Sequence, residues 1–434
     1  MKAIDRYFEL HKHGTDVRTE ILAGIATFLT MAYIIFVNPS ILSAAGMDQG
    51  AVFVATCLAA ALSSAIMGLY ANYPIALAPG MGLNAYFAFG MVQGMGLPWQ
   101  TALGAVFVSG LIAVLLSISP AREWIFNSIP TTLKMAISAG IGLFLGIIAL
   151  KNAGIITANP NTLVTLGDLH SLPVVLAAGG FMVMVALEAR NVTGAIIIAI
   201  LLTTAVGVAL GVSPAQGLMS MPPSLAPTFL QLDIGHAFEV GLVTIIFSLV
   251  FVDLFDTAGT LVGVSHRAGL LTPDGKLPRL RKALIADSSA SMIGALLGTS
   301  NTTSYIESAA GVKVGGRTGL TAVTVAVLFL LALFFSPLAG TVPAYATAPA
   351  LLFVACLMAR GLTEIDWNDA TEYAPAVVTA IAMPLTFSIA TGIAFGFITY
   401  AGIKILSGRA REMSIAVTVL AALFTLKFAL FGTS

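Results

Sequence analysis

The sequence predicts a polytopic all-α membrane protein, and three observations support this prediction. Of the 434 residues, 58% are hydrophobic and 9% are charged, and the mean hydropathy is +0.97. A soluble protein carries about 25% charged residues. Apolar runs of roughly 20 residues recur along the whole chain, and each could cross a bilayer as a helix. A transmembrane β-barrel would show short alternating segments instead, so helices are the expected spanning elements.

Residues 1–20 form a polar stretch of mixed charge, without the basic start and short apolar core of a cleaved signal peptide. We therefore expect the first span to be retained. Fourteen spans are predicted, at residues 21–42, 51–70, 74–92, 101–119, 131–150, 172–188, 194–212, 240–264, 283–298, 300–313, 319–337, 343–360, 373–388 and 391–407. A further apolar stretch, 413–431, either spans or lies at the interface, and Lys427 within it would have to reach the interface.

The basic residues support this layout, because cytoplasmic loops collect Lys and Arg. With a cytoplasmic N-terminus, every one of the 20 Lys and Arg residues except Lys151 and Lys427 falls on the cytoplasmic side. The loop 265–282 is the most basic of these regions. We expect a multi-pass protein of the plasma membrane, the inner membrane in a bacterium, with its N-terminus in the cytoplasm.

The two halves of the chain are predicted to be inverted repeats. Seven is an odd number, so a second set of seven spans starts on the opposite side of the membrane from the first. The seventh span reads TGAIIIAILLTTAVGVALG from Thr193, and the fourteenth reads TGIAFGFITYAGIKILSG from Thr391. The third and tenth segments, from Leu77 and Leu297, also correspond in position and character.

The third and tenth segments are unusual for membrane helices. Residues 74–92 contain two prolines, several glycines and Asn84, and residues 297–316 contain a run of Ser, Thr and Asn followed by Glu307. Non-helical backbone at membrane depth persists only where protein buries it or where it lines a wet cavity. Paired broken segments in an inverted repeat therefore predict a binding site near the membrane midplane. Close helix packing through small residues is the alternative, but it does not require the carboxylate.

Three carboxylates lie deep in the predicted spans, at Asp253, Asp256 and Glu307. Such a group must be paired, hydrated or protonated. Asp253 and Asp256 are three residues apart, so they share one face of a helix. No Lys or Arg in the spans is placed to neutralise them, which leaves a proton, a coupling cation or a hydrogen-bonding substrate. The alternative, strongest for Asp253, is a structural hydrogen bond between helices. Asp287 begins the ninth span near the basic loop, where we expect only an interaction with the helix N-terminus.

Other features argue against enzymatic classes. No P-loop, nucleophile–base pair or metal-ligand spacing is present in the sequence, and Cys57 and Cys356 lie in apolar runs typical of packing. We therefore expect no enzyme activity, cofactor or metal. The net charge of zero also gives no reason to expect a nucleic-acid partner. An intramembrane aspartyl protease is the enzymatic alternative. It would need one acid from each of two helices, whereas Asp253 and Asp256 lie on one.

Four long motifs, in order, make the sequence similar to the azaguanine/purine permease family, a branch of the nucleobase–cation symporters. They are TFLTMAYIIFVNP from Thr27, ALAPGMGLNAYFAF from Ala76, VDLFDTAGTL from Val252 and GTSNTTSYIESAAGVKVGGRTGLTA from Gly298. The resemblance implies a uracil-transporter-like fold of two inverted seven-span repeats. Its core domain would comprise residues 21–119 and 240–337, and its gate domain residues 131–212 and 343–407, with an additional C-terminal helix at 413–431.

The resemblance also implies residue roles. Asp256, followed by Gly259, and Glu307 would contact the base. Asn84, which matches the polar residue of the third segment, would also bind it. Thr257 and Ser304 would supply hydroxyls to the site. The aromatic side chains that could stack on the purine ring are Tyr86, Phe87, Phe255 and Tyr305. Protonation of Asp253, Asp256 or Glu307 would couple transport to the proton gradient.

The expected function is import of purine nucleobases, hypoxanthine or guanine and also adenine, by proton symport with alternating access. The sequence GLNAYF around Asn84 favours hypoxanthine and guanine over adenine alone. The alternatives are a carrier for adenine only, uracil or xanthine, and coupling to sodium in place of the proton. An anion carrier of the same fold is disfavoured, because the site carboxylates would repel sulfate or bicarbonate. The expected partners are the base, the coupling ion, the bilayer and a second copy in a homodimer.

Overall fold

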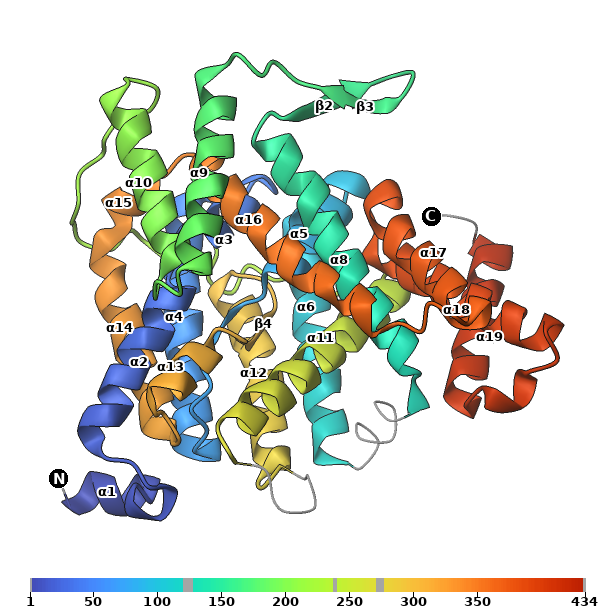
Figure 1. Cartoon of the computed structure of the whole chain (residues 1–434), viewed down its shortest axis with the longest axis horizontal. Helices are drawn as coiled ribbons and strands as arrows, with labels where there is room; N and C mark the ends of the chain where they lie inside the picture. Colours follow the sequence, from blue (N-terminus) through green and yellow to red (C-terminus); the bar gives the residue numbers. More distant parts are fainter. Residues whose placement is uncertain (1, 120–127, 237–239, 271–276, 432–434) are drawn as a thin grey trace.

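The computed structural model describes residues 2–119, 128–236, 240–270 and 277–431, and most of them are helical (Figure 1). Within this part of the chain, nine helices are long and apolar enough to cross a membrane. Two shorter apolar helices, Ala195–Ala209 and Ile415–Ala429, accompany them. The prediction of an all-helical membrane protein is confirmed at this level.

Each predicted segment coincides with a helix, or with a strand followed by a helix. The first half contains α1 (Lys2–Phe8), α2 (Val17–Met31), α3 (Ile34–Ser43), α4 (Gln49–Ile66), the π-helix η2 (Met67–Ala71), β1 (Leu77–Pro79), α5 (Met81–Ala85), the π-helix η3 (Tyr86–Gly94), α6 (Trp99–Ile118), α8 (Thr131–Asn152), β2 (Ile156–Asn159), β3 (Leu163–Leu166), α9 (Leu172–Ala189) and α10 (Ala195–Ala209). The second half contains α11 (Val240–Arg267), α12 (Leu280–Leu297), β4 (Thr302–Ser304), α13 (Ser308–Val314), α14 (Gly319–Ala332), α15 (Ser336–Thr341), α16 (Ala344–Ala359), α17 (Ala370–Thr386), α18 (Ile389–Leu406) and α19 (Ile415–Phe431).

The first predicted span lies within one apolar stretch, Val17–Ser43, that is long enough to cross a membrane. Its helix is interrupted at Ala32 and Tyr33, between α2 and α3. Asp16 begins α2 by accepting a hydrogen bond from the backbone of Thr19 at 2.9 Å. Such a cap satisfies a donor that the first turn of a helix leaves open. Tyr33 is fully buried, so this break places a polar side chain inside the protein.

Packing sorts most of the helices into two groups (Figure 1). Helices α2, α4 and α6 pack against α12, α13 and α14, whereas α8, α9 and α10 pack against α16, and α17 joins α8 and α18. Helix α11 contacts α6 from the first group and α8 and α18 from the second. Helix α1 lies at one end of the molecule, and the hairpin β2–β3 lies at the other (Figure 1).

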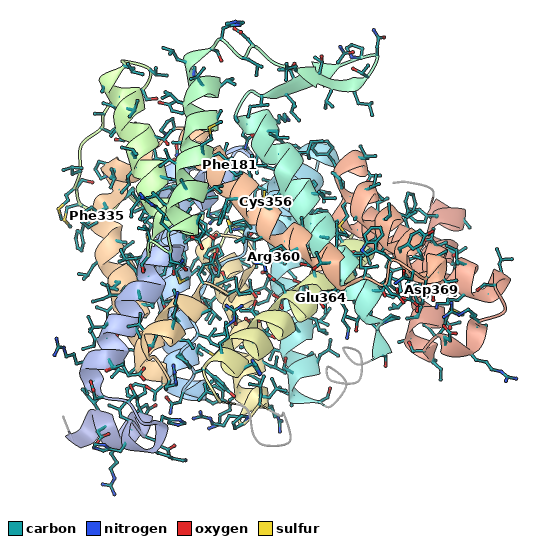
Figure 2. All side chains as sticks on the ribbon, viewed as in Figure 1. Phe181, Phe335, Cys356, Arg360, Glu364 and Asp369 are labelled. Carbon is teal, nitrogen blue, oxygen red and sulfur yellow. The ribbon has the colours of Figure 1, made fainter. Side chains whose placement is uncertain are left out.

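An ion-pair cluster joins the ends of α17 and α18 (Figure 2 labels Asp369 within it). Lys404 is fully buried, and its Nζ lies 2.7 Å from Glu372 and 2.8 Å from Glu412. Arg409 contacts Asp369 at 2.6 Å and Glu412 at 2.7 Å. Two carboxylates around one buried ammonium compensate the loss of its hydration.

The two cysteines are free thiols. Cys57 is buried, as expected for a packing residue. Cys356 is exposed on α16, which departs from that expectation (Figure 2).

Candidate functional site

The two broken segments meet in a short antiparallel sheet. Strands β1 and β4 pair with Leu77 opposite Ser304, Ala78 opposite Thr303 and Pro79 opposite Thr302. Two backbone bonds of 2.9 Å extend the pairing, from Gly80 to Asn301 and from Tyr305 to Ala76. Each strand leads into a short helix, α5 or α13. The prediction that both segments begin as non-helical chain is therefore confirmed.

Side chains from two helices satisfy the outer edges of this sheet. The Ser64 hydroxyl on α4 accepts from the Leu77 amide at 2.9 Å and donates to the Leu77 carbonyl at 3.0 Å. On the other edge, Ser291 on α12 donates to the Thr302 carbonyl at 3.0 Å. Buried backbone groups need such partners, because hydrocarbon supplies none.

Asp287 completes the second edge, and this corrects the expectation for it. It lies in the second turn of α12 and is fully buried. Its Oδ1 accepts from the Ser304 amide at 2.8 Å and from the Ser304 hydroxyl at 2.6 Å, while Thr257 on α11 donates to Oδ2. Because the sequence places Asp287 at the start of a span near a basic loop, only an interaction with the helix N-terminus was expected. The run Asp287, Ser288, Ser289 and Ser291 inside a predicted span was the signal that such polar residues need buried partners.

Asp253 is joined to the tenth segment through Asn301. The Asn301 amide donates to Asp253 Oδ1 at 2.9 Å and to the Ser291 hydroxyl at 2.8 Å. Asp253 and Asn301 are almost completely buried. The alternative of a structural hydrogen bond thus describes one contact of Asp253, whose role in coupling stays a prediction.

Asn84 lies at the centre of a buried amide and hydroxyl network. Its Nδ2 donates to Asn38 Oδ1 at 2.6 Å, and its Oδ1 accepts from the Ser300 hydroxyl. Asn38 in turn donates to Thr56 at 2.7 Å and to Thr299 at 2.8 Å. Both polar atoms of Asn84 are therefore engaged, and its side chain ties the third segment to the first and the tenth. Sequence analysis missed Asn38, although its place beside a proline in the first span was a signal.

Glu307 precedes α13 and is held by the first span. The Tyr33 hydroxyl donates to its Oε1 at 2.6 Å. The Thr30 hydroxyl donates to its backbone carbonyl at 3.4 Å. Glu307 is half-buried, so part of the carboxylate stays accessible. Tyr33, which sequence analysis did not identify, thus orients a predicted site carboxylate.

Asp256 has the most open environment of the predicted carboxylates. Its side chain is exposed, and the described part of the chain offers it no hydrogen bond or ion pair. At Gly259, one turn further along, a Cβ atom would meet nothing within 4 Å. The residue after Asp256, Thr257, donates to Asp287, and Asp287 in turn binds Ser304, three residues before Glu307. The structure therefore brings together three carboxylates beside an open face of α11.

The other predicted site residues differ in their accessibility. Thr257 is fully buried, and Ser304 is nearly so, with each hydroxyl bonded to Asp287. Tyr305 is mostly buried and donates to the Pro79 carbonyl at 2.6 Å. Tyr86 and Phe87 are fully buried in the hydrophobic core, so neither offers a ring face in this conformation. The Phe255 side chain lies outside the described residues. Their contacts with a base stay predictions.

An open stripe on α11 leads from Asp256 toward one end of the molecule. Asp256, Gly259, His266 and Arg267 are exposed, whereas the described side chains of residues 245–254 are buried apart from the half-buried Phe247. The 267 end lies on the same side as α1 (Figure 1). The exposed residues of α11 thus lie between Asp256 and the end of the helix on the α1 side.

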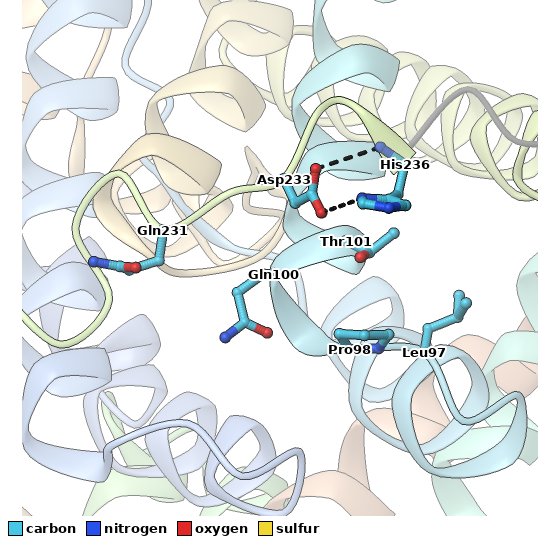
Figure 3. A pocket seen from close by; sticks show the side chains of 7 residues that line it. All are labelled: Leu97, Pro98, Gln100, Thr101, Gln231, Asp233 and His236. Carbon is cyan, nitrogen blue, oxygen red and sulfur yellow. Dashed lines mark hydrogen bonds and ion pairs between the residues drawn. The ribbon is translucent and has the colours of Figure 1, made fainter.

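A separate cavity of about 460 Å³ lies beside the start of α6 (Figure 3). It is lined by Leu97, Pro98, Gln100, Thr101, Gln231, Asp233 and His236. The Asp233 carboxylate contacts the His236 ring at 2.6 Å. This cavity contains none of the predicted site residues, and the carboxylates at the β1–β4 crossing are the better candidates.

Paired broken segments, together with carboxylates inside the membrane-spanning region, are typical of a membrane transporter. Residues 18–395 match the family described as Permease family, Xan_ur_permease. The chain belongs to this family of permeases and is not an enzyme.

The chain is similar over nearly its whole length to two bacterial nucleobase permeases. The chain is 52% identical to adenine permease AdeP of Escherichia coli K12 over 98% of this chain and 95% of that protein. It is 49% identical to guanine/hypoxanthine permease PbuG of Bacillus subtilis 168 over 97% of this chain and 98% of that protein. Among solved structures, the transmembrane domain of the cyanobacterial bicarbonate transporter BicA matches with a TM-score of 0.63 at 16% identity, over 87% of this chain and 96% of that domain. That likeness shows a shared fold.

Proposed function

We propose that this protein is a secondary active transporter that imports purine nucleobases by proton symport. The observation that carries the proposal is the site itself, where Asp287 binds both Thr257, the neighbour of the exposed Asp256, and Ser304, three residues before Glu307. Two accessible carboxylates suit a purine, whose ring N–H groups need acceptors. They do not suit an inorganic anion, which they would repel.

Two relatives support the substrate class, since one is named for adenine and the other for guanine and hypoxanthine. Our proposal takes hypoxanthine and guanine as the preferred bases, from the sequence around Asn84. Adenine is a second candidate, supported by the 52% identity to the adenine permease.

The proposed coupling uses a carboxylate that changes its protonation during the cycle. Asp256 or Glu307 takes up a proton when the site faces outward, and the neutral acid accompanies the base inward. Opening to the other side rehydrates the carboxylate and releases the proton. A charged, unpaired carboxylate in a closed site would be costly, so the empty carrier returns only after its charge is compensated. Sodium bound by the same oxygens is the alternative coupling ion.

The proposed architecture has fourteen spans in two inverted repeats, with the core and gate domains at the boundaries given above. The packing of α2–α6 with α12–α14, and of α8–α10 with α16–α18, supports such a division. We place the N-terminus in the cytoplasm and the protein in the inner membrane of a bacterial cell. The open stripe on α11 then makes this an inward-facing state. A homodimer is part of the proposal and rests on what is common among carriers of this fold.

Uptake of radiolabelled hypoxanthine into proteoliposomes tests the proposal. Uptake is measured with an inward proton gradient, with an inward sodium gradient and with neither, and is competed by guanine, adenine, uracil and sulfate. We expect accumulation only with the proton gradient, and we expect guanine to block it while uracil and sulfate do not. Competition by adenine sets the breadth of specificity.

Three results would change the proposal. Accumulation driven only by sodium would replace the coupling ion, and a block by uracil would widen the substrate class. Absence of uptake of hypoxanthine, guanine and adenine by a preparation that is folded and monodisperse would refute the substrate assignment. Equal uptake with and without ion gradients would refute symport.

A further inference from the structure

Glu20, a buried carboxylate near the α1 end of α2, caps another helix of the protein. It is fully buried, and its Oε1 accepts from the Arg317 amide at 2.8 Å. Its Oε2 accepts from the Thr318 amide at 3.3 Å and from the amide and hydroxyl of Thr321 at 3.2 and 2.5 Å. Three of these donors are backbone amides just before α14 or in its first turn, where helices leave amides without full helical partners. The Thr321 amide also donates to the Thr318 carbonyl at 3.2 Å. A carboxylate there is also favoured by the helix dipole.

Arg317 occupies the short connection between α13 and α14. Its guanidinium Nη1 donates to the carbonyls of Val312 and Gly316, each at 2.7 Å. Val312 belongs to the last turn of α13, where carbonyls lack helical partners and favour a cation. One residue therefore fixes the end of α13 through its side chain and binds Glu20 through its backbone.

The packing between α2 and this connection leaves no space for adjustment. A Cβ at Gly311 would lie 2.2 Å from the Thr27 hydroxyl and 2.5 Å from the Ala23 carbonyl. A Cβ at Gly316 would lie 2.9 Å from the Ala23 side chain. Helix α13 is only seven residues long, so a shift at its C-terminal end moves its other end as well. Glu307 precedes that other end and is held there by Tyr33 on the first span.

We propose that Glu20 and Arg317 form a clamp that positions Glu307 for transport. The clamp fixes α13 against α2 at its C-terminal end, as Tyr33 does at its N-terminal end. Glu20 is then a positioning residue that acts on the site through α13 without touching the substrate. This inference rests on the proposed function, because Glu307 is taken as a substrate-binding group.

Glu20→Gln and Arg317→Gln test the clamp, and Glu9→Gln is the matched control. Glu9 is an exposed carboxylate at the same end of the molecule, and its side chain contacts Lys12 and His13. We expect each clamp variant to raise the KM for hypoxanthine about tenfold, the factor that one lost hydrogen bond to a charged group produces. The maximal rate per folded molecule should change less than the KM, and Glu9→Gln should change neither. The double variant should be no worse than the stronger single one.

Hydrogen exchange of the backbone amides provides a readout that does not need a substrate. The clamp predicts faster exchange in peptides covering residues 308–316 of both variants, with the rest of the protein unchanged. A lower thermal midpoint with unchanged KM and uniformly faster exchange would show a merely structural role and overturn the proposal. Unchanged KM together with unchanged exchange would also overturn it. If the wild-type protein takes up no purine, the proposed function fails, and the exchange of residues 308–316 alone decides whether the clamp exists.

Discussion

Replacement of Asp287 tests whether the paired strands need a side-chain acceptor on their open edge. In Asp287→Ala the Ser304 amide loses its 2.8 Å acceptor inside the protein, and the hydroxyls of Ser304 and Thr257 lose theirs. The hydroxyls can rotate toward other acceptors, but the amide cannot. An orphaned buried donor costs about 1–3 kcal/mol, so the variant should lose about 2–4 kcal/mol once the hydroxyls contribute. Asp287→Asn keeps one acceptor oxygen and should lose less.

The assay compares thermal unfolding in detergent with hypoxanthine uptake per folded molecule. Ser289→Ala is the control on the same helix. Among the described residues, the Ser289 hydroxyl donates to the Ala286 carbonyl at 2.8 Å and to no other group. We expect the largest decrease in thermal midpoint in Asp287→Ala and a smaller decrease in Asp287→Asn. The Ser289→Ala control should stay near wild type. Uptake should fall in the same order. Wild-type stability and uptake in Asp287→Ala would refute the edge-capping argument.

Three further predictions concern other parts of the chain. Asp256→Asn should abolish accumulation driven by a proton gradient, while exchange of labelled for unlabelled hypoxanthine should persist. Full gradient-driven uptake in both Asp256→Asn and Glu307→Gln would contradict proton coupling at these residues. Tyr33→Phe removes a 2.6 Å bond to Glu307, worth about 1.5–3 kcal/mol, so uptake kinetics should show a KM raised about tenfold or more. Hydrogen bonds from Thr371 and Arg409 lower the pKa of Asp369 from 3.8 to about 2. These hydrogen bonds stabilise the folded protein fully when the pH is above the ordinary pKa of Asp369, and the stabilisation is lost as the pH falls through the lowered pKa. The difference in thermal midpoint between wild type and Arg409→Gln should therefore be constant near neutral pH and shrink between about pH 4 and pH 2.

Hydrophobic length predicted most of the fold. The apolar runs located the helices to within a few residues, because a span must remain apolar over about 20 residues. Proline and glycine in the third and tenth segments correctly predicted broken helices. The first span was located correctly, but the interruption of its helix at Ala32 and Tyr33 was not predicted. The run 21–42 is apolar throughout, and its proline, Pro39, lies inside α3 and not at the interruption. The pairing of β1 with β4 was also missed, because three-residue strands from opposite halves of the chain carry no detectable periodicity.

The site was predictable in its residue types but only partly in its contacts. Carboxylates inside spans are rare enough to select Asp256 and Glu307 as candidate site residues, and their roles stay predictions. The roles of Asn84 and Asp287 depend on which helices lie beside them, and a single sequence does not contain that information. Asn84 was expected to contact the base, yet both of its polar atoms bond to neighbouring side chains. Its contact with a base stays a prediction.

The acids of the site differ in their roles because a small sheet inside the membrane needs hydrogen-bond partners. Two strands without further neighbours need acceptors and donors on their outer edges, and Asp287 supplies one of them. Asp253 is engaged by Asn301 and Glu307 by Tyr33, each at the same crossing. An acid that holds backbone in place cannot lose its charge in every transport cycle without weakening the fold. Asp256 accepts no hydrogen bond from the described part of the chain, and it faces the open stripe of α11. We infer that the proton is carried first by Asp256, because its protonation alone leaves every contact of the crossing intact.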